Sequence, residues 1–312
     1  MARGLWLESS FKLNFDRTPC FWPRHPVVTC FGALFVALTR KALAPITHTR
    51  YRWRNMLVQE YVGKLARIAS DFVDLQWGIT IQSLVDIAPR ARGRLLDVGC
   101  GDKPYEDIFR PFVTEYVGIE HEATFSATSA QNYRKKPDYY YDGKRLPFED
   151  GSFDTVLNVQ VLEHTPHPGV LVREMSRVLK PDGQLILTAP FEFRLHEEPH
   201  DFFRYTPHGL AALCSEAGLE VVFTEQQGDL TTVIGHKING YLALRVARLQ
   251  SVAQSVGKLG HESADAPKVR WWTLPIVAPT MASIALAARV FEKAFHDPQN
   301  ALGFLIVARK VR

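Results

Sequence analysis

The sequence predicts a doubly wound α/β fold with a mostly parallel, seven-stranded sheet. Three observations predict it. Short apolar strands alternate with helical patterns from residue 94 onward, a glycine turn follows the first strand, and acidic residues follow the next two strands. Strands that alternate with helices form parallel βαβ units with right-handed crossovers. Such sheets bind ligands at the carboxyl ends of their central strands, so functional residues are expected there.

The predicted elements are short and regularly spaced. Strands are expected at residues 95–98, 116–120, 139–141, 155–158, 184–188, 219–224 and 303–308, with helices at 105–112, 169–179 and 207–217. Helical spacing of apolar residues over 51–87 predicts one or two more helices before the core. The expected divisions are an N-terminal helical extension (1–90), the core (91–228), a hydrophobic helical insertion (229–300) and the final core strand (301–312).

The strongest local signal is the segment LLDVGCGDKPY, residues 95–105. Gly99 and Gly101, which flank Cys100, lack a Cβ, so the backbone there can approach a ligand closely. Pro104 is placed to start the following helix. A lone G-x-G also occurs in tight turns that bind nothing, so further evidence is needed.

Acidic residues at the ends of the next strands supply that evidence. Glu120 ends the second strand, about 20 residues after the glycine turn, where a carboxylate can accept hydrogen bonds from both ribose hydroxyls of an adenosine cofactor. Asp142 follows the third strand and could accept a hydrogen bond from the adenine amino group. The pattern therefore favours an adenosine-containing cofactor.

The charge of the turn separates the two main cofactors of this kind. A dinucleotide pyrophosphate favours G-x-G-x-x-G, but Pro104 occupies the third glycine position. Asp97 would also bring a negative charge near the pyrophosphate. S-adenosylmethionine instead has an ammonium group and a sulfonium centre, both attracted by Asp97. The sequence therefore favours S-adenosylmethionine over NAD.

These motifs resemble the class I, Rossmann-like methyltransferases that use S-adenosylmethionine, specifically the type 11 group. The matching segments cover under half of the chain and are LLDVGCG, YVGIE, YDGKRLPFEDGSFDTVLNVQVLEH, SRVLKPDGQLILTAP, LAALCSEAGLEVV and GFLIVARK. The resemblance implies that the cofactor is bound by Asp97, Gly99, Cys100 and Gly101 at the methionine part, Glu120 at the ribose, Asp142 and Gly143 at the adenine, and the Val159 backbone. Lys103 departs from the family, in which many relatives have a third glycine.

Methyl transfer mainly requires alignment of donor and acceptor, but an oxygen or nitrogen acceptor can also need a base. Histidine titrates near neutral pH and is the natural base. His164 follows the fourth strand, whereas His196 and His200 lie in the loop after the fifth strand, which should face the acceptor. We expect His196 or His200 to act in preference to His164, although each could be an ordinary loop residue. Further candidates are Glu163, Glu197, Glu198 and Asp201.

The resemblance favours O-methylation over N- or C-methylation. The acceptor is expected to be a small molecule, a glycan or a lipid-linked compound. Loops similar to residues 196–206, with the pattern H…PHDFFRYT, occur in family members associated with glycan biosynthesis. Two other functions remain open: a membrane-associated binding protein that keeps the fold without turnover, and, less favoured, an NAD(P)-dependent oxidoreductase.

Two segments partly match metal-binding motifs. HEEPH, residues 196–200, matches H-E-x-x-H, but that motif needs a continuous helix, which Pro199 would break. QVLEH resembles the E-x-x-E-H of some magnesium-dependent methyltransferases, but Gln160 removes one carboxylate. We therefore expect no metal, although Glu163, His164 and one loop histidine could still gather one. The four cysteines form no CxxC pair, which suits a reducing, cytoplasmic setting without disulfides.

The net charge of +4 is unevenly distributed. Residues 1–60 carry +6 and residues 236–312 carry +7, which leaves −9 for the segment between them. Basic flanks are attracted to anionic surfaces or substrates, although scattered solvated side chains give the same balance. Neither flank contains a dense basic run or a known binding module, so nucleic acid is not an expected partner.

Two apolar stretches need an explanation outside the core. Residues 26–39 are too short to span a membrane and suit an interfacial or buried helix. Residues 271–288 are long enough, but Pro275 and Pro279 argue against one straight helix. The strands on either side of the insertion are expected to be neighbours, which excludes a single crossing. The segment is therefore expected to be a packed lid or pocket wall, or to make peripheral contact with an anionic membrane.

Overall fold

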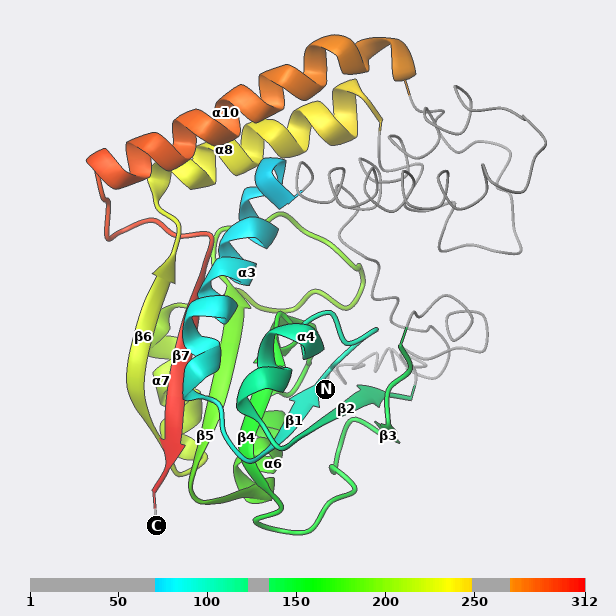
Figure 1. Cartoon of the computed structure of the whole chain (residues 1–312), viewed down its shortest axis with the longest axis vertical. Coiled ribbons are helices and arrows are strands. Elements are labelled where there is room, and N and C mark those ends of the chain that lie inside the picture. Colours follow the sequence, from blue (N-terminus) through cyan, green and yellow to red (C-terminus); the bar gives the residue numbers. More distant parts are fainter. Residues whose placement is uncertain (1–70, 123–134, 249–269, 312) are drawn as a thin grey trace, which may run out of the picture.

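The computed structural model describes residues 71–122, 135–248 and 270–311 (Figure 1). At its centre is a seven-stranded sheet with the order β3-β2-β1-β4-β5-β7-β6. The strands are β1 Arg94–Val98, β2 Glu115–His121, β3 Tyr139–Tyr141, β4 Phe153–Val159, β5 Leu179–Pro190, β6 Leu219–Gln227 and β7 Gly303–Lys310. β7 runs antiparallel to both of its neighbours, β5 and β6, and the other strand pairs of the described sheet are parallel. The predicted doubly wound, mostly parallel sheet is confirmed.

Helices cover both faces of this sheet. Helices α3 (Leu75–Ile87) and α4 (Glu106–Phe109) pack on one face, and α6 (Pro168–Val178) and α7 (Pro207–Glu216) pack on the other. The sequence of α6 explains why it forms a helix that packs on this face. It begins with proline, which is favoured in a first helical turn, and its buried residues recur at helical spacing. Those buried apolar residues are Leu171, Val172, Met175 and Val178.

The strand order determines where a ligand can bind. The chain winds outward from β1 to β2 and β3 in one direction, and from β4 to β5 in the other. The connections after β1 and β4 therefore diverge at the carboxyl edge of the sheet, which opens a crevice between them. The side chains of Leu95 and Leu96 on β1 are fully buried on opposite faces, so this central strand is held rigidly.

The helix predicted at 105–112 is shorter than expected. Helix α4 begins at Glu106 and ends at Phe109, and a 3₁₀ turn follows at Arg110–Phe112. Pro111 has no N–H to continue the α-helical bonding, which explains the break. Pro104 was expected to start the helix; it lies instead in the turn before Tyr105, so that prediction was wrong.

The chain between β6 and β7 forms two helices that lie side by side across the carboxyl end of the sheet (Figure 1). Helix α8 (Leu230–Tyr241) continues into a π-helical turn at Leu242–Val246, and α10 is Leu274–Ala294. The Asn239 side chain of α8 donates hydrogen bonds to the carbonyl oxygens of Val73 and Met281, each at 3.1 Å. Because β6 and β7 pair along their length, both ends of this segment return to one sheet, which excludes a single membrane crossing.

Helix α10 is continuous, contrary to the prediction, and it is long and apolar. It is a single helix of 21 residues: Pro275 lies in its first turn and Pro279 lies within it, so the predicted interruption is absent. Together with the preceding turn it spans 24 residues, and it is long and apolar enough to cross a membrane by composition alone. Only 28% of its most apolar window is buried. The apolar stretch 26–39, and also Cys20 and Cys30, lie outside the described residues.

The packing of α6 gives a matched test of the fold. Val172 is fully buried, whereas Val170, two positions away on the same helix, is 36% exposed. We expect Val172→Ala to lower the free energy of unfolding by about 2 kcal/mol, because two methyl groups leave a cavity. Val170→Ala should change it by less than about 0.5 kcal/mol. Urea denaturation followed by circular dichroism measures both, and equal losses would contradict this placement of α6.

Candidate functional site

The glycine turn after β1 has the conformation that its residues predict. Gly99 and Gly101 have φ of 76° and 51°, in the left-handed region that favours glycine. A Cβ on Gly99 would lie 2.5 Å from a methyl carbon of Val161, in the segment after β4. The turn therefore passes directly against the neighbouring loop, and a larger residue would separate them.

Glu120, at the end of β2, is bound to this turn. One of its carboxylate oxygens accepts from the Gly101 backbone N–H and the other from the His121 backbone N–H, both at 2.8 Å. The side chain is 4% exposed. Each carboxylate oxygen can accept two hydrogen bonds, so acceptor capacity remains for the two hydroxyls of a ribose.

Lys103 adopts the left-handed backbone conformation that a glycine would favour at this position of the turn. Its φ is 55°, which costs an L-residue about 1–2 kcal/mol relative to the right-handed region. Its ammonium group lies 2.6 Å from the carboxylate of Asp138. The lysine chain crosses Gly118 of β2, where an added Cβ would lie 2.6 Å from the lysine Cε. The pairing with Asp138 and the need for Gly118 were not recognised in the sequence.

Asp97 lies in β1, immediately before the turn, and is 1% exposed. Burial raises the pKa of Asp97 to about 7, against an opposing hydrogen bond from the Tyr116 hydroxyl at 2.5 Å. The charge of Glu120 raises this pKa further. A positively charged ligand beside Asp97 would reverse these effects and stabilise its ionised form.

Asp142 and Gly143 form a turn after β3. Asp142 Oδ1 accepts from the backbone N–H groups of Lys144 and Arg145, at 2.9 and 3.1 Å, and these bonds lower the pKa of Asp142. Gly143 has φ of 80°, and a Cβ there would lie 2.5 Å from His121 Nε2. The exposed Asp142 carboxylate thus stabilises its own turn. Val159, the last residue of β4, is buried at the same sheet edge.

A second set of groups comes from the segments after β4 and β5. The His164 and His196 rings meet edge to face, with their centroids 4.6 Å apart. His164 Nε2 lies 3.7 Å from Glu163 Oε1 and 3.9 Å from Glu197 Oε2. We call Glu163, His164, His196 and Glu197 the histidine–glutamate cluster. Two of the three predicted histidines are therefore in contact, and both glutamates join them.

His200, the third predicted histidine, has a different place. Its backbone carbonyl accepts a hydrogen bond from His164 Nδ1 at 2.7 Å. Its ring stacks at a tilt near Phe202, with centroids 6.3 Å apart. Within the described part of the chain its Nε2 is buried and has no hydrogen-bond partner. His200 therefore orients His164 through its main chain, and which of the three histidines acts as a base stays a prediction.

Burial determines the protonation of the cluster. It lowers the pKa of His196 to about 4 and also lowers the pKa of His164. Burial raises the pKa values of Glu163 and Glu197 to about 8. At neutral pH the cluster therefore holds uncharged imidazoles beside protonated carboxyl groups.

The loop that carries His196 and Glu197 is closed by Asp201. Burial opposes ionisation of Asp201, but hydrogen bonds from the Arg204 side chain and the His196 N–H outweigh it and lower the pKa to about 2. Arg204 donates to both Asp201 oxygens, at 2.6 and 2.7 Å. The loop also joins the segment after β4, because the Phe202 N–H donates to the Glu163 carbonyl at 2.9 Å.

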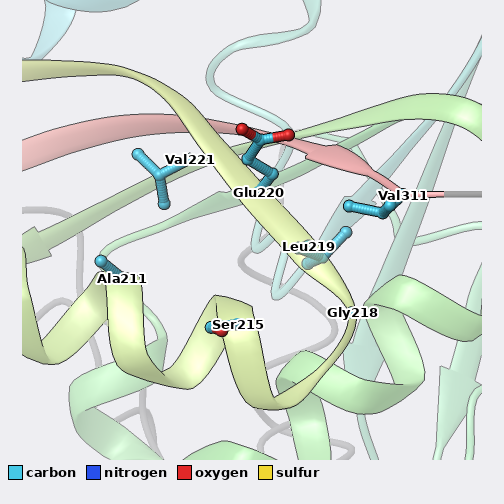
Figure 2. A pocket seen from close by; sticks show the side chains of 7 residues that line it. All are labelled: Ala211, Ser215, Gly218, Leu219, Glu220, Val221 and Val311. Carbon is cyan, nitrogen blue, oxygen red and sulfur yellow. The ribbon is translucent and has the colours of Figure 1, made fainter.

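The two sets of residues lie at one edge of the sheet. The charge of Glu120 contributes to the raised pKa of Glu197, so the two carboxyl groups are electrostatic neighbours. By contrast, a groove of about 450 Å³ lies between α7 and the start of β6, at the opposite end of the sheet (Figure 2). Glu220 is the one acid among its lining residues, and the groove contains none of the predicted site residues.

Comparison with known proteins agrees with this geometry. Residues 96–187 match the model of a methyltransferase domain family. The chain contains a class I methyltransferase domain. The cofactor of this domain is S-adenosylmethionine, as the glycine turn and Asp97 had indicated.

The curated relatives match part of the chain. An uncharacterized methyltransferase of Mycobacteroides abscessus is 30% identical over 145 residues, which is 45% of this chain and 54% of the relative. A protein of Mycobacterium tuberculosis named a probable S-adenosylmethionine-dependent methyltransferase is 30% identical over 105 residues, or 33% of this chain and 38% of the relative. The chain thus spans about half or less of their length.

The comparison also finds solved structures of low identity. The S-adenosylmethionine-dependent methyltransferase from Mesorhizobium loti is 14% identical, with a TM-score of 0.43 over 75% of this chain and 97% of that chain.

The raised pKa of Asp97 predicts a pH dependence of cofactor binding. A cationic ligand favours ionised Asp97, so binding should tighten as pH rises from 5.5 through about 7 and then level off, with release of a proton. In the ligand-free protein the same raised pKa acts oppositely: the stability contribution of protonated Asp97 is present below about pH 4 and is lost as pH rises through 7. Calorimetric titration with S-adenosylmethionine across this range measures the slope. Asp97→Asn should remove the Asp97 contribution, and an unchanged slope in that variant would contradict the assignment.

Proposed function

We propose that this protein transfers the methyl group of S-adenosylmethionine to an oxygen of a small-molecule, glycan or lipid-linked acceptor. The observation that carries the proposal is the meeting of two groups of residues at one sheet edge. The first is the glycine turn with Glu120 and Asp97, and the second is the histidine–glutamate cluster.

The residues of the first group fit S-adenosylmethionine. Gly99 and Gly101 keep the left-handed backbone of the turn, and Glu120 has acceptor capacity for two ribose hydroxyls. Asp97 is a buried acid whose ionisation needs a nearby cation, which the ammonium and sulfonium groups provide. When bound, the cofactor supplies an electrophilic methyl group on a positively charged sulfur.

The residues of the second group suit a hydroxyl acceptor. As the acceptor oxygen bonds to the methyl carbon, its proton must pass to another atom. The imidazoles of His164 and His196 are uncharged at neutral pH because burial lowers their pKa values, so a ring nitrogen is available to take that proton. The loop after β5 holds these rings in place through Asp201 and Arg204.

Calorimetric titration of the full chain with S-adenosylmethionine, S-adenosylhomocysteine and NAD tests the cofactor assignment. We expect both adenosyl ligands to bind and NAD not to bind. Glu120→Ala should weaken binding by about 100-fold or more, because two ribose hydroxyls lose a charged acceptor that contributes about 1.5–3 kcal/mol for each bond. Glu220→Ala, which removes an exposed glutamate at the far end of the sheet, is the matched control.

The alternatives make different predictions in the same experiment. Failure of both adenosyl ligands to bind to well-folded protein would favour a non-catalytic, membrane-associated protein. Binding of NAD would favour an oxidoreductase.

We also propose that the outer face of α8 and α10 contacts an anionic membrane from the cytoplasmic side. The buried stripe of α10 includes Val277, Met281 and Ala285, while the opposite stripe is also apolar and exposed. Trp272 and Ile276 at its start are 77% and 73% exposed. Other exposed apolar residues of the pair are Leu230, Ile234, Ile238, Tyr241, Trp271, Leu286, Val290, Phe291 and Phe295. A helix that is apolar on all sides needs an apolar environment on its outer face too.

Flotation with lipid vesicles tests this contact. The full chain should float with vesicles that contain anionic lipid, and bind more weakly to neutral ones, because of the basic residues near α8 and α10. Ile276→Glu should reduce the floating fraction at least about fivefold, since it puts a charge into the buried face of the contact. Val85→Glu alters an exposed valine of α3 and should have no effect. Wild-type protein that stays unbound to anionic vesicles would exclude the proposal.

A further inference from the structure

Glu163 is an anomaly in the packing of the site. Its side chain is 0% exposed. Among the residues that the structure describes, no other residue forms a hydrogen bond with either of its carboxylate oxygens. Buried polar groups are almost always satisfied, and an exception calls for an explanation such as a bound ion. Glu163 therefore indicates that another group belongs beside it.

The neighbours of Glu163 are groups that bind metal ions. Ligand atoms of Glu163, His164 and His196 all lie within 4.8 Å of one another. His164 Nε2 is directed toward two carboxylates, 3.7 Å from Glu163 Oε1 and 3.9 Å from Glu197 Oε2. Two ligands at about 2.1 Å from a tetrahedral metal ion are about 3.4 Å apart. Small side-chain adjustments would therefore bring these atoms to coordination distance.

The Nδ1 atoms of His164 and His196 have the kind of partner that is typical of metal-binding histidines. His164 Nδ1 donates to the His200 carbonyl at 2.7 Å, and His196 Nδ1 lies 3.2 Å from Asp201 Oδ2. Histidines that bind metals almost always donate their second ring N–H to a carbonyl or a carboxylate, which fixes the tautomer and the ring orientation. In His196 this leaves Nε2 as the nitrogen that a cation would take.

We propose that Glu163, His164 and His196 bind a divalent transition-metal ion, with Glu197 as a fourth ligand. Two imidazole nitrogens with two carboxylates suit Zn²⁺, Mn²⁺ or Co²⁺, whereas Mg²⁺ and Ca²⁺ prefer oxygen ligands alone. The site differs from a zinc-protease helix, because its histidines come from two separate segments and the His200 ring is not a ligand.

The position of the ion suggests its use, and this step rests on the proposed function. A divalent cation at this site would bind the acceptor oxygen and lower the pKa of its hydroxyl group, so that the proton passes to solvent water and not to an imidazole. The imidazoles would then act as ligands that position the acceptor. Metal binding itself does not depend on this role.

The test is metal binding by the full chain, stripped with a chelator and dialysed. Calorimetric titration with Zn²⁺ alone and with Mn²⁺ alone should give one equivalent for at least one of the two ions. Bound Co²⁺ should show visible absorption bands typical of mixed nitrogen and oxygen ligation. Glu163→Gln and His196→Ala should each lower the affinity by about 100-fold or more, and Asp201→Asn by about 10–100-fold through loss of the histidine partner.

His208→Ala is the matched control, because this exposed histidine lies on α7 away from the cluster. It should leave the affinity unchanged. Less than one equivalent bound by wild-type protein at 100 µM metal, or equal losses in His208→Ala and His196→Ala, would overturn the proposal. Circular dichroism checks the folding of each variant; if Glu163→Gln does not fold, His196→Ala and the wild-type stoichiometry still decide. Titration with S-adenosylmethionine is a separate measurement, so failure of cofactor binding can be distinguished from failure of metal binding.

Discussion

The Glu120 carboxylate connects the parts of the site that the sheet keeps separate. β1 and β2 are parallel neighbours, but the chain leaves β1 through a flexible glycine turn. The hydrogen bonds from the Gly101 and His121 backbone N–H groups to Glu120 fix this turn against the end of β2. Without a buried acceptor at this point, two buried donors would lose their partners, at about 1–3 kcal/mol each. The same carboxylate thus holds the turn in place, and in the proposed function it would also bind the cofactor ribose.

The carboxyl edge of the sheet gathers buried acids that are costly without a cation. Burial raises the pKa values of Asp97, Glu163 and Glu197 toward or above neutrality. Such groups weaken the ligand-free protein, and the free energy is recovered when a positive charge arrives. In the proposed function, the sulfonium cofactor would satisfy this need at Asp97. The proposed metal ion would satisfy it at the histidine–glutamate cluster.

The central strands β1, β2, β4 and β5 were predictable because each contains a short apolar run whose length and flanking turns suit a buried parallel strand. The common edge of Glu120 and Asp142 was predictable because parallel strands put their carboxyl ends at one edge, whereas their contact with the cofactor stays a prediction. The loop after β5 was harder. Which of its histidines meets His164 depends on the Asp201–Arg204 pairing, and sequence spacing does not reveal that contact. Pro279 was misjudged because a proline near the start of a long helix removes one hydrogen bond, which the packing of α10 against α8 outweighs.

The helix pair α8–α10 connects the proposed membrane contact to the site. Phe193, in the loop that also carries His196, lies with its ring 5.2 Å from that of His236 on α8 and 4.9 Å from that of His196. Lys237 of α8 pairs with Glu192 at the start of the same loop. Phe193 and Glu192 thus connect helix α8 to the loop that carries His196. The proposed membrane contact would therefore be felt at the loop that carries His196, and a lipid-linked acceptor is the member of the proposed acceptor classes for which this link would matter most.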